Sequence, residues 1–126
     1  MVIGSRYIRG GGVFAWELWR RLLSQWGNFY CHLVTSLPIS DCTGGYNTIS
    51  AAKLRMIDFS KLSMLGYAFQ FELKYTVWKM GFKIKEVPII FKNRVNGDSK
   101  ISHDIIKEGL IAPWKLVFGA KRKSNM

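Results

Sequence analysis

The chain has 126 residues, 48% of them hydrophobic and 14% aromatic, and it carries a formal net charge of +11 at pH 7. This length fits one small domain or a piece of a larger one, and so much apolar material excludes a chain that is disordered throughout. The excess of Lys and Arg favours a polyanion, an anionic membrane surface or a phosphorylated ligand, without choosing among them.

The first predicted element is a strand that ends at Val2-Ile3-Gly4, directly after Met1. It lacks the basic segment and the longer apolar run of a signal peptide. Because a strand needs neighbours to pair with, we expect further sequence upstream in a longer protein. Arg6 follows the strand and precedes glycines 10–12. Ligands bind at strand ends in open α/β sheets, so Arg6 is a candidate ligand residue, although a solvated arginine beside a turn fits equally well.

A long amphipathic helix is predicted from Val13 to about Leu37, where Pro38 closes it. Its apolar residues recur at spacings of three and four: Phe14, Leu18, Leu22, Trp26, Phe29, Leu33 and Leu37. Polar residues interrupt the pattern before it reaches the roughly 18 apolar residues of a membrane span. Arg20 and Ser24 share one helical face, where a guanidinium beside a hydroxyl suits a phosphate; an ordinary polar stripe is the alternative.

A glycine-containing loop is predicted from Ile39 to Tyr46, and its residues Asp41, Thr43, Gly44 and Gly45 are candidates for substrate contact. The glycines let the backbone approach a ligand closely, and the Asp41 carboxylate is suited to orient a hydroxyl or to act as a base. A turn capped by Asp41 is the alternative. Cys31 and Cys42 have no C-x-x-C spacing and read as free thiols, and the two histidines lack a zinc-binding pattern.

The remaining elements alternate between helix and strand. We expect a strand at Tyr46–Ser50, a helix at Ala51–Ile57, a helix at Tyr67–Met80 ended by Gly81, one strand at Phe82–Phe91, a mobile loop at Asn93–Ser102, a helix from His103 to about Phe118 and a basic, disordered tail at 119–126. Pro88 places the last strand near a sheet edge. Three strands with several helices predict an α/β fold that is only part of a sheet.

Three further features suggest chemistry. Arg94 and Lys100 lie on the Gly/Ser loop beyond the last strand, where two cations could close over phosphates, and a basic surface loop is equally consistent. Glu72 lies among aromatic residues, so its carboxylate has to be paired or functional. The final helix carries Trp114 and a basic end, which favours a membrane surface or, equally, packing against a partner.

Seven short motifs follow one another: GSRY, GGG, W-x-x-x-R-x-L-x-S, SDCTGGY, GYAFQFEL, EVPIIF and R-x-x-G-D-S-K. This succession resembles the C-terminal half of dolichol-phosphate mannosyltransferases (polyprenol monophosphomannose synthases), which are family 2 inverting glycosyltransferases of the GT-A, Rossmann-like fold. Single motifs such as EVPI also occur in related polyprenyl-phosphate glycosyltransferases, but the whole string is more specific. The resemblance extends over nearly the whole chain.

The resemblance implies roles for individual residues. Arg6, Arg20 and Ser24 correspond to positions that gather the phosphates of donor and lipid acceptor, and Arg94 and Lys100 to the loop that covers the nucleotide-sugar phosphates. The loop of Asp41, Thr43, Gly44 and Gly45 corresponds to the acidic loop near the reacting sugar. Gln70 and Glu72 correspond to a helix that lines the site, and Asp41 and Glu72 are the candidate catalytic carboxylates.

The resemblance also implies what this chain lacks. The family binds nucleotide through an N-terminal half and holds Mg²⁺ or Mn²⁺ with an Asp-x-Asp motif, and this chain contains no Asp-x-Asp. We therefore expect residues 1–118 to be the acceptor-side portion of a catalytic domain, inactive alone, with metal ligands and donor half elsewhere. The expected reaction is mannose transfer from GDP-mannose to dolichyl or another polyprenyl phosphate. The expected location is peripheral, on the cytoplasmic face of a membrane, with a possible anchoring subunit. Transfer of another hexose and, less favoured, a nucleic-acid-binding module stay open.

Overall fold

The computed structural model describes residues 1–92 and 103–124. Its elements in chain order are β1 (Val2–Ser5), β2 (Gly12–Phe14), α1 (Leu18–Thr35), β3 (Asn47–Thr48), α2 (Ala51–Leu54), the 3-10 helix η1 (Phe59–Lys61), α3 (Gly66–Lys79), β4 (Lys85–Pro88), β5 (Ile90–Lys92) and α4 (His103–Ser124). The predicted mixed α/β character is confirmed.

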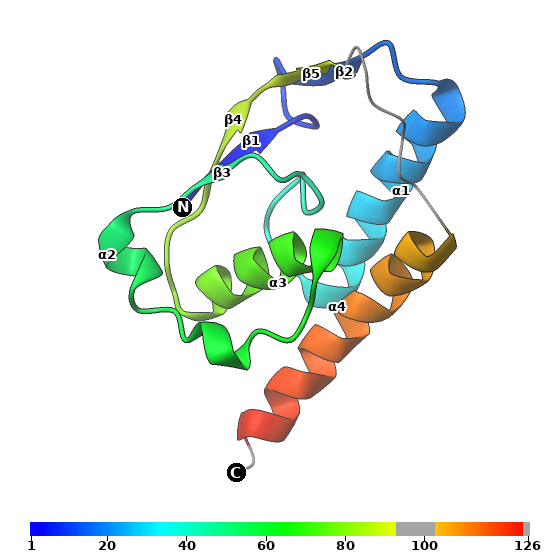
Figure 1. Ribbon diagram of the computed structural model, residues 1–126. Helices are drawn as coiled ribbons and strands as arrows, with labels where there is room; N and C mark the ends of the chain where they lie inside the picture. Colours follow the sequence, from blue (N-terminus) through cyan, green and yellow to red (C-terminus); the bar gives the residue numbers. More distant parts are fainter. Residues whose placement is uncertain (93–102, 125–126) are drawn as a thin grey trace.

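The strands form two small sheets on one side of the helices (Figure 1). In the first sheet β1 lies between β3 and β4, antiparallel to β3 and parallel to β4. Pro88 therefore belongs to an edge strand, as predicted. The second sheet pairs β2 with β5 in parallel. α3 crosses beneath the first sheet, and α4 contacts both α1 and α3.

The single strand predicted over Phe82–Phe91 is wrong, because Ile89 divides it into β4 and β5. The backbone N–H of Ile89 donates to the carbonyl of Ser5 at 3.0 Å, and its own carbonyl accepts from the N–H of Gly12 at 3.0 Å. Ile89 thus connects the first sheet to the second. This exchange of partners depends on long-range pairing, which a local alternation of apolar residues does not reveal.

The predicted start of the long helix at Val13 is also wrong. Val13 and Phe14 belong to β2, opposite Phe91 and Lys92 of β5. Ala15 then takes a φ of 59°, in the left-handed region, so a continuous helix from Val13 is not possible. α1 begins only at Leu18 and ends at Thr35, two residues before the predicted end at Leu37.

The shorter elements agree with the prediction more closely. β3 and α2 lie within the ranges predicted for them, and the 3-10 turn η1 after α2 was not predicted. α3 matches its predicted range to within one residue at each end, and Gly81 after it has a φ of 80°, as a C-terminal helix-ending glycine should. The last helix contains Pro113 as expected, but it continues to Ser124 instead of ending near Phe118.

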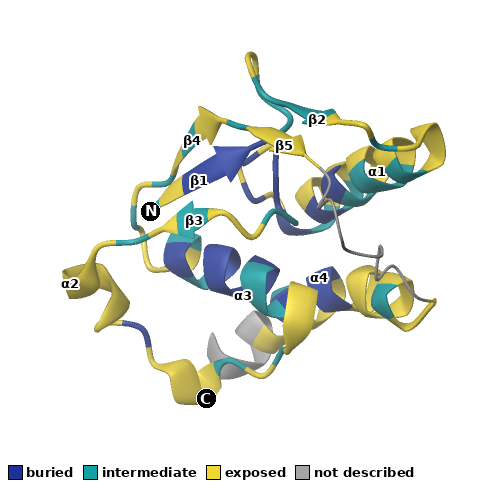
Figure 2. Cartoon of the chain, turned by 45° about the horizontal axis from the view of Figure 1, so that its top comes forward, coloured by how far each residue is buried: buried dark blue, intermediate teal, exposed yellow. Residues whose placement is uncertain are grey.

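α1 turns its polar face inward. Its buried residues are Asn28, Cys31 and Thr35, whereas its large apolar residues are exposed, and Figure 2 shows both buried and exposed positions along α1. The exposed set comprises Leu18, Trp19, Leu22, Trp26, Phe29 and Leu33. An exposed apolar stripe of this length on one helix marks an interaction surface. Among the described residues, no helix combines the length and apolar character needed to cross a membrane.

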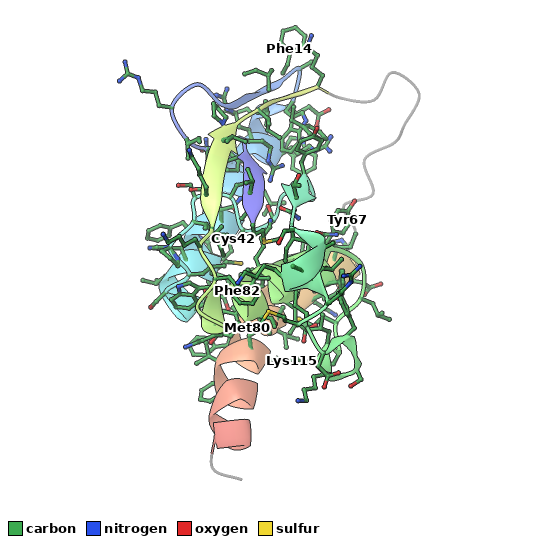
Figure 3. The ribbon with its side chains drawn as sticks, turned by 90° about the vertical axis from the view of Figure 1, so that its left-hand side faces the viewer. Phe14, Cys42, Tyr67, Met80, Phe82 and Lys115 are labelled. Atoms are coloured by element: carbon green, nitrogen blue, oxygen red, sulfur yellow. The ribbon has the colours of Figure 1, made fainter. Side chains whose placement is uncertain are left out.

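The core lies between the first sheet and the helices. Ile3, Leu37, Ile39, Cys42 and Phe71 are buried in one cluster, and Cys42 lies at the junction of sheet and helices (Figure 3). Both cysteines are free and buried, in agreement with the prediction of free thiols. Burial raises the pKa of Cys31 to about 11 and that of Cys42 to about 12, so both thiols stay protonated and unreactive at neutral pH.

Candidate phosphate-binding site

A cavity of about 1070 Å³ opens between the sheet ends, α1, α3 and α4. One end is polar, with Arg6, Arg20, Ser24, Thr43 and the backbone of Gly44 and Gly45. The other end lies between the helices and is mainly apolar, and its wall includes Leu23, Tyr30, Tyr67, Phe71, Ile105 and Leu110, together with the carboxylate of Glu108. The cavity therefore suits a ligand with a charged head and an apolar body.

Arg6 and Asp41 form the central ion pair at the polar end. The Nε and Nη2 atoms of Arg6 donate to Oδ2 and Oδ1 of Asp41, each at 2.8 Å, and Nη2 also donates to Oγ1 of Thr43 at 3.0 Å. Burial alone would raise the pKa of Asp41, but the hydrogen bonds and charge of Arg6, with the charge of Lys74, outweigh it and lower that pKa below its ordinary value. Asp41 is therefore a weak base here.

Every backbone N–H from Ser40 to Gly44 donates to a side-chain oxygen. Those of Ser40 and Asp41 donate to Oε1 of Glu86 at 2.9 and 3.0 Å. Those of Cys42 and Thr43 donate to Oδ1 of Asn28 at 2.6 and 3.2 Å, and that of Gly44 donates to Oδ1 of Asp41 at 2.9 Å. The loop therefore does not offer these amides as an anion-binding nest. A phosphate at this end has to be held by side chains.

The carbonyls of the same loop converge on Lys74 of α3. Its Nζ donates to the carbonyls of Asp41 at 3.3 Å and Cys42 at 3.1 Å, and also to that of Gly44. Lys74 is fully buried. Neither Lys74 nor Asn28 was predicted as a site residue. A lysine inside the apolar helix Tyr67–Met80, and an asparagine one turn after Ser24, are the signals that could have identified them.

Arg20 and Arg6 both lie beside the ring of Trp16. The guanidinium carbon of Arg20 lies 4.3 Å from the centroid of the Trp16 ring, and that of Arg6 lies 5.5 Å from it. The Trp16 ring also meets Phe91 edge to face at 5.7 Å. Two arginines held against one aromatic ring form a compact cationic group, because the face of the ring attracts each guanidinium.

The side chain of Ser24 is also fixed at the polar end, because the hydroxyl of Tyr7 donates a hydrogen bond to its Oγ. Arg6, Arg20, Ser24, Thr43, Gly44 and Gly45 thus line one cavity.

Gln70 and Glu72 lie elsewhere, and both have structural partners. Oε1 of Gln70 accepts from Nδ2 of Asn47 at 2.8 Å, which ties α3 to β3. The buried carboxylate of Glu72 accepts from the backbone N–H groups of Ser63 and Met64, the latter at 2.8 Å. Glu72 is therefore paired, as its burial requires, and it fixes the turn before α3. Neither residue lines the cavity, and their catalytic roles stay predictions.

Arg94 and Lys100 lie outside the described residues. Within residues 1–92 and the described part of α4, no group of three or more His, Cys, Asp or Glu side chains is placed to hold a metal ion. The residues present at the site do not fit a divalent cation, since Asp41 is committed to Arg6.

Two named relatives are similar to this chain. Polyprenol monophosphomannose synthase from Mycolicibacterium smegmatis is 40% identical over 117 residues, which cover 90% of the chain and 44% of the relative. Undecaprenyl-phosphate mannosyltransferase from Micrococcus luteus is 36% identical over 123 residues, which cover 91% of the chain and 51% of the relative.

The resemblance to polyprenol monophosphomannose synthases is confirmed. The chain spans about half the length of the curated relatives it matches. No family model and no solved structure matches it.

Proposed function

We propose that this chain is the acceptor-side part of an inverting glycosyltransferase of the GT-A fold that transfers mannose from GDP-mannose to a polyprenyl phosphate. The single observation that carries the proposal is the cavity, whose cationic end holds Arg6 and Arg20 and whose apolar end runs between helices. The names of the two relatives support a mannosyl donor and a polyprenyl phosphate acceptor.

Each end of the cavity would bind a different part of the acceptor lipid. The phosphate would lie near Arg6, Arg20 and the hydroxyl of Ser24, where the arginines supply charge-assisted hydrogen bonds. The first isoprene units would follow the apolar wall between α1 and α4. A nucleic acid fits this cavity poorly, because its bases and sugars carry polar groups that the apolar end cannot pair.

The chemistry needs positioning more than proton transfer. An oxygen of the acceptor phosphate would attack the anomeric carbon of mannose, forming the new C–O bond while the bond to the diphosphate breaks and GDP leaves with the electron pair. Because the attacking phosphate is already an anion, no strong general base is required, which agrees with an Asp41 that is paired with Arg6. A divalent cation, Mg²⁺ or Mn²⁺, would be held in the longer protein, outside the described residues.

The outward apolar face of α1 supports peripheral attachment to a membrane. It continues onto α4, because Trp26 stacks on Tyr30 at 5.5 Å and the indole N–H of Trp114 donates to the Tyr30 hydroxyl at 2.7 Å. Trp114 in turn stacks on Phe118 at 5.8 Å. Tryptophan and tyrosine suit the interfacial depth of a bilayer. The cytoplasmic face and an anchoring subunit are part of the same proposal.

The proposal is tested by binding and by transfer. Farnesyl phosphate, a short polyprenyl phosphate, should bind the chain and change its tryptophan fluorescence, and farnesol should bind much more weakly. Arg20→Gln should lower the affinity for farnesyl phosphate by about tenfold, because it removes one charge-assisted contact. In the longer protein the same substitution should lower mannose transfer from GDP-mannose, whereas the 126-residue chain alone should show none. Equal affinity for farnesol and farnesyl phosphate would exclude a phosphate site here.

A further inference from the structure

Lys74 is a charged side chain in a place where a charge is costly. It lies in the middle of α3, has a relative exposure of 0% and is the largest fully buried side chain in the described part of the chain. Its ammonium group is the one that donates to the carbonyls of Asp41, Cys42 and Gly44. A buried ammonium needs such partners to offset the loss of its hydration.

The number of donors on the ammonium group equals the number of loop carbonyls that it meets. A charged lysine has three N–H donors, and it meets three carbonyls. The amides of the loop are already bound by Glu86, Asn28 and Asp41. Lys74 thus holds the carbonyl side of the segment that presents Thr43 and Gly44 to the cavity. A neutral amine would have one donor fewer and would leave one of these carbonyls without it.

The charged groups around Lys74 also favour a charged ammonium group at this position. The groups that face it are Asp41 and Cys42 of the loop, Cys31 of α1, Arg6 after β1 and Glu86 of β4. Both thiols are uncharged at neutral pH, because burial raises the pKa of each. Among the groups that face it, Arg6 and a charged Lys74 balance the carboxylates Asp41 and Glu86. With Lys74 neutral, these groups carry one net negative charge, which would repel a phosphate.

We propose that Lys74 is a positioning residue for the phosphate site: its ammonium group holds the 41–44 loop, with its Asp41–Arg6 pair, in the binding conformation and supplies the positive charge that offsets the nearby carboxylates. This inference rests on the proposed function. Lys74 does not line the cavity, so it acts through the loop and not by contact with the ligand.

The pH dependence of farnesyl phosphate binding is the first test. Burial lowers the pKa of Lys74 to about 8, against the attraction of Asp41. The phosphate has a second pKa of about 6 and the arginines do not titrate. The small remaining ionisation of the phosphate above pH 7 makes it more negative, so it cannot cause a loss of affinity. We expect the affinity of the wild-type chain to fall severalfold with a midpoint near pH 8.

Lys74→Met removes the charge and nearly keeps the volume. This variant should bind farnesyl phosphate about tenfold more weakly at pH 7 and should show no pH dependence up to pH 9.5. Lys74→Arg, if it folds, should stay charged above pH 8, so its affinity for farnesyl phosphate should not fall above that pH. Lys79→Met is the matched control, because Lys79 lies on the same helix and is exposed, and it should bind as the wild type does.

A second measurement separates this inference from the proposed function. The amide signals of Cys42, Thr43 and Gly44, followed by NMR without ligand, should shift with a midpoint near pH 8 in the wild type and not in Lys74→Met. If they shift but farnesyl phosphate does not bind, the proposed function is wrong and the loop-holding role stands. If the amide signals do not shift, or if the wild-type affinity is constant through pH 9.5, the positioning role of Lys74 is wrong.

Discussion

Arg6 and Asp41 are 35 residues apart in sequence, yet Asp41 receives both the side chain and the backbone N–H of Arg6. The side chain of Asp41 is fully buried and that of Arg6 is 10% exposed. The pair joins the end of β1 to the glycine-containing loop. It also fixes the guanidinium beside the rings of Tyr7, Trp16 and Phe91, at 5.2 to 6.0 Å.

Asp41→Asn should strongly destabilise the fold. It leaves the Arg6 charge buried without its counter-charge, and removing one partner of a buried pair costs about 3–5 kcal/mol. Urea unfolding followed by tryptophan fluorescence measures the loss. Asp58→Asn is the matched control, because Asp58 pairs with Lys61 at the surface, and its unfolding midpoint should not change. Equal effects of the two substitutions would contradict a dominant Arg6–Asp41 pair.

Lys74 should contribute a rise in folding stability between pH 8 and 9. The pKa of Lys74 is lowered from 10.5 in the unfolded chain to about 8 by burial, so in this range the unfolded state binds more protons than the folded state. Linkage then predicts a gain of about 1 kcal/mol from Lys74 over that pH unit. The two cysteines act in the opposite direction over the same range, because burial raises their pKa values and only the unfolded thiols ionise there.

Lys74→Met keeps both cysteines and is the reference for this measurement. When urea unfolding is compared at each pH, the stability of the wild type relative to the variant should increase by about 1 kcal/mol from pH 8 to 9. The proposed phosphate affinity falls over the same range in which this relative stability rises, so binding that merely followed stability would be recognised by its opposite sign. A stability difference between wild type and variant that stays constant from pH 8 to 9 would contradict the lowered pKa.

Gly44→Ala should weaken phosphate binding more strongly than Gly45→Ala. A Cβ at Gly44 would lie 3.1 Å from both carboxylate oxygens of Asp41, which Arg6 prevents from moving away. A Cβ at Gly45 would meet nothing within 4 Å. We expect a severalfold loss of farnesyl phosphate affinity in the first variant, measured by fluorescence titration. Identical affinities would mean that the Asp41 carboxylate does not set the site geometry.

Leu22→Asp should reduce binding to anionic vesicles without changing stability. Leu22 is 54% exposed on the outward face of α1, and a charge there opposes insertion at the interface. Met56→Asp is the matched control, because Met56 is 59% exposed and follows α2, which lies on the opposite side of the molecule from α1 (Figure 1). Co-sedimentation at low salt should separate the two variants. Equal loss in both would indicate a charge effect alone.

The sequence predicted the elements whose signals are local. β1, β3 and α3 were found because apolar spacing and the helix-ending Gly81 act within a few residues. The pairing of β2 with β5 was missed, because both strands are short and each needs a distant partner. The direction in which α1 faces was not predictable from periodicity, which gives a stripe but not the side that it covers.

Among the site residues, too, those in local motifs were predicted and those with distant partners were missed. Arg6, Arg20 and Thr43 were predicted, and the structure brings them to one cavity. Lys74 was missed because its partners are backbone carbonyls about 30 residues earlier in the chain, and no side-chain motif records them. Asn28 was missed for a similar reason, since it binds the amides of Cys42 and Thr43.

Ile89 closes the segment from Ser5 to Gly12 into a ring, because it binds the backbone at both ends. A Cβ at Gly11 would lie 2.5 Å from the carbonyl of Ser5, so the two ends of this loop are in close contact, and we call this point its neck. The tip at Arg9 and Gly10 is exposed. Extra residues placed at that tip would lengthen the loop at little entropic cost and leave Arg6 where it is, whereas added bulk at the neck would displace it.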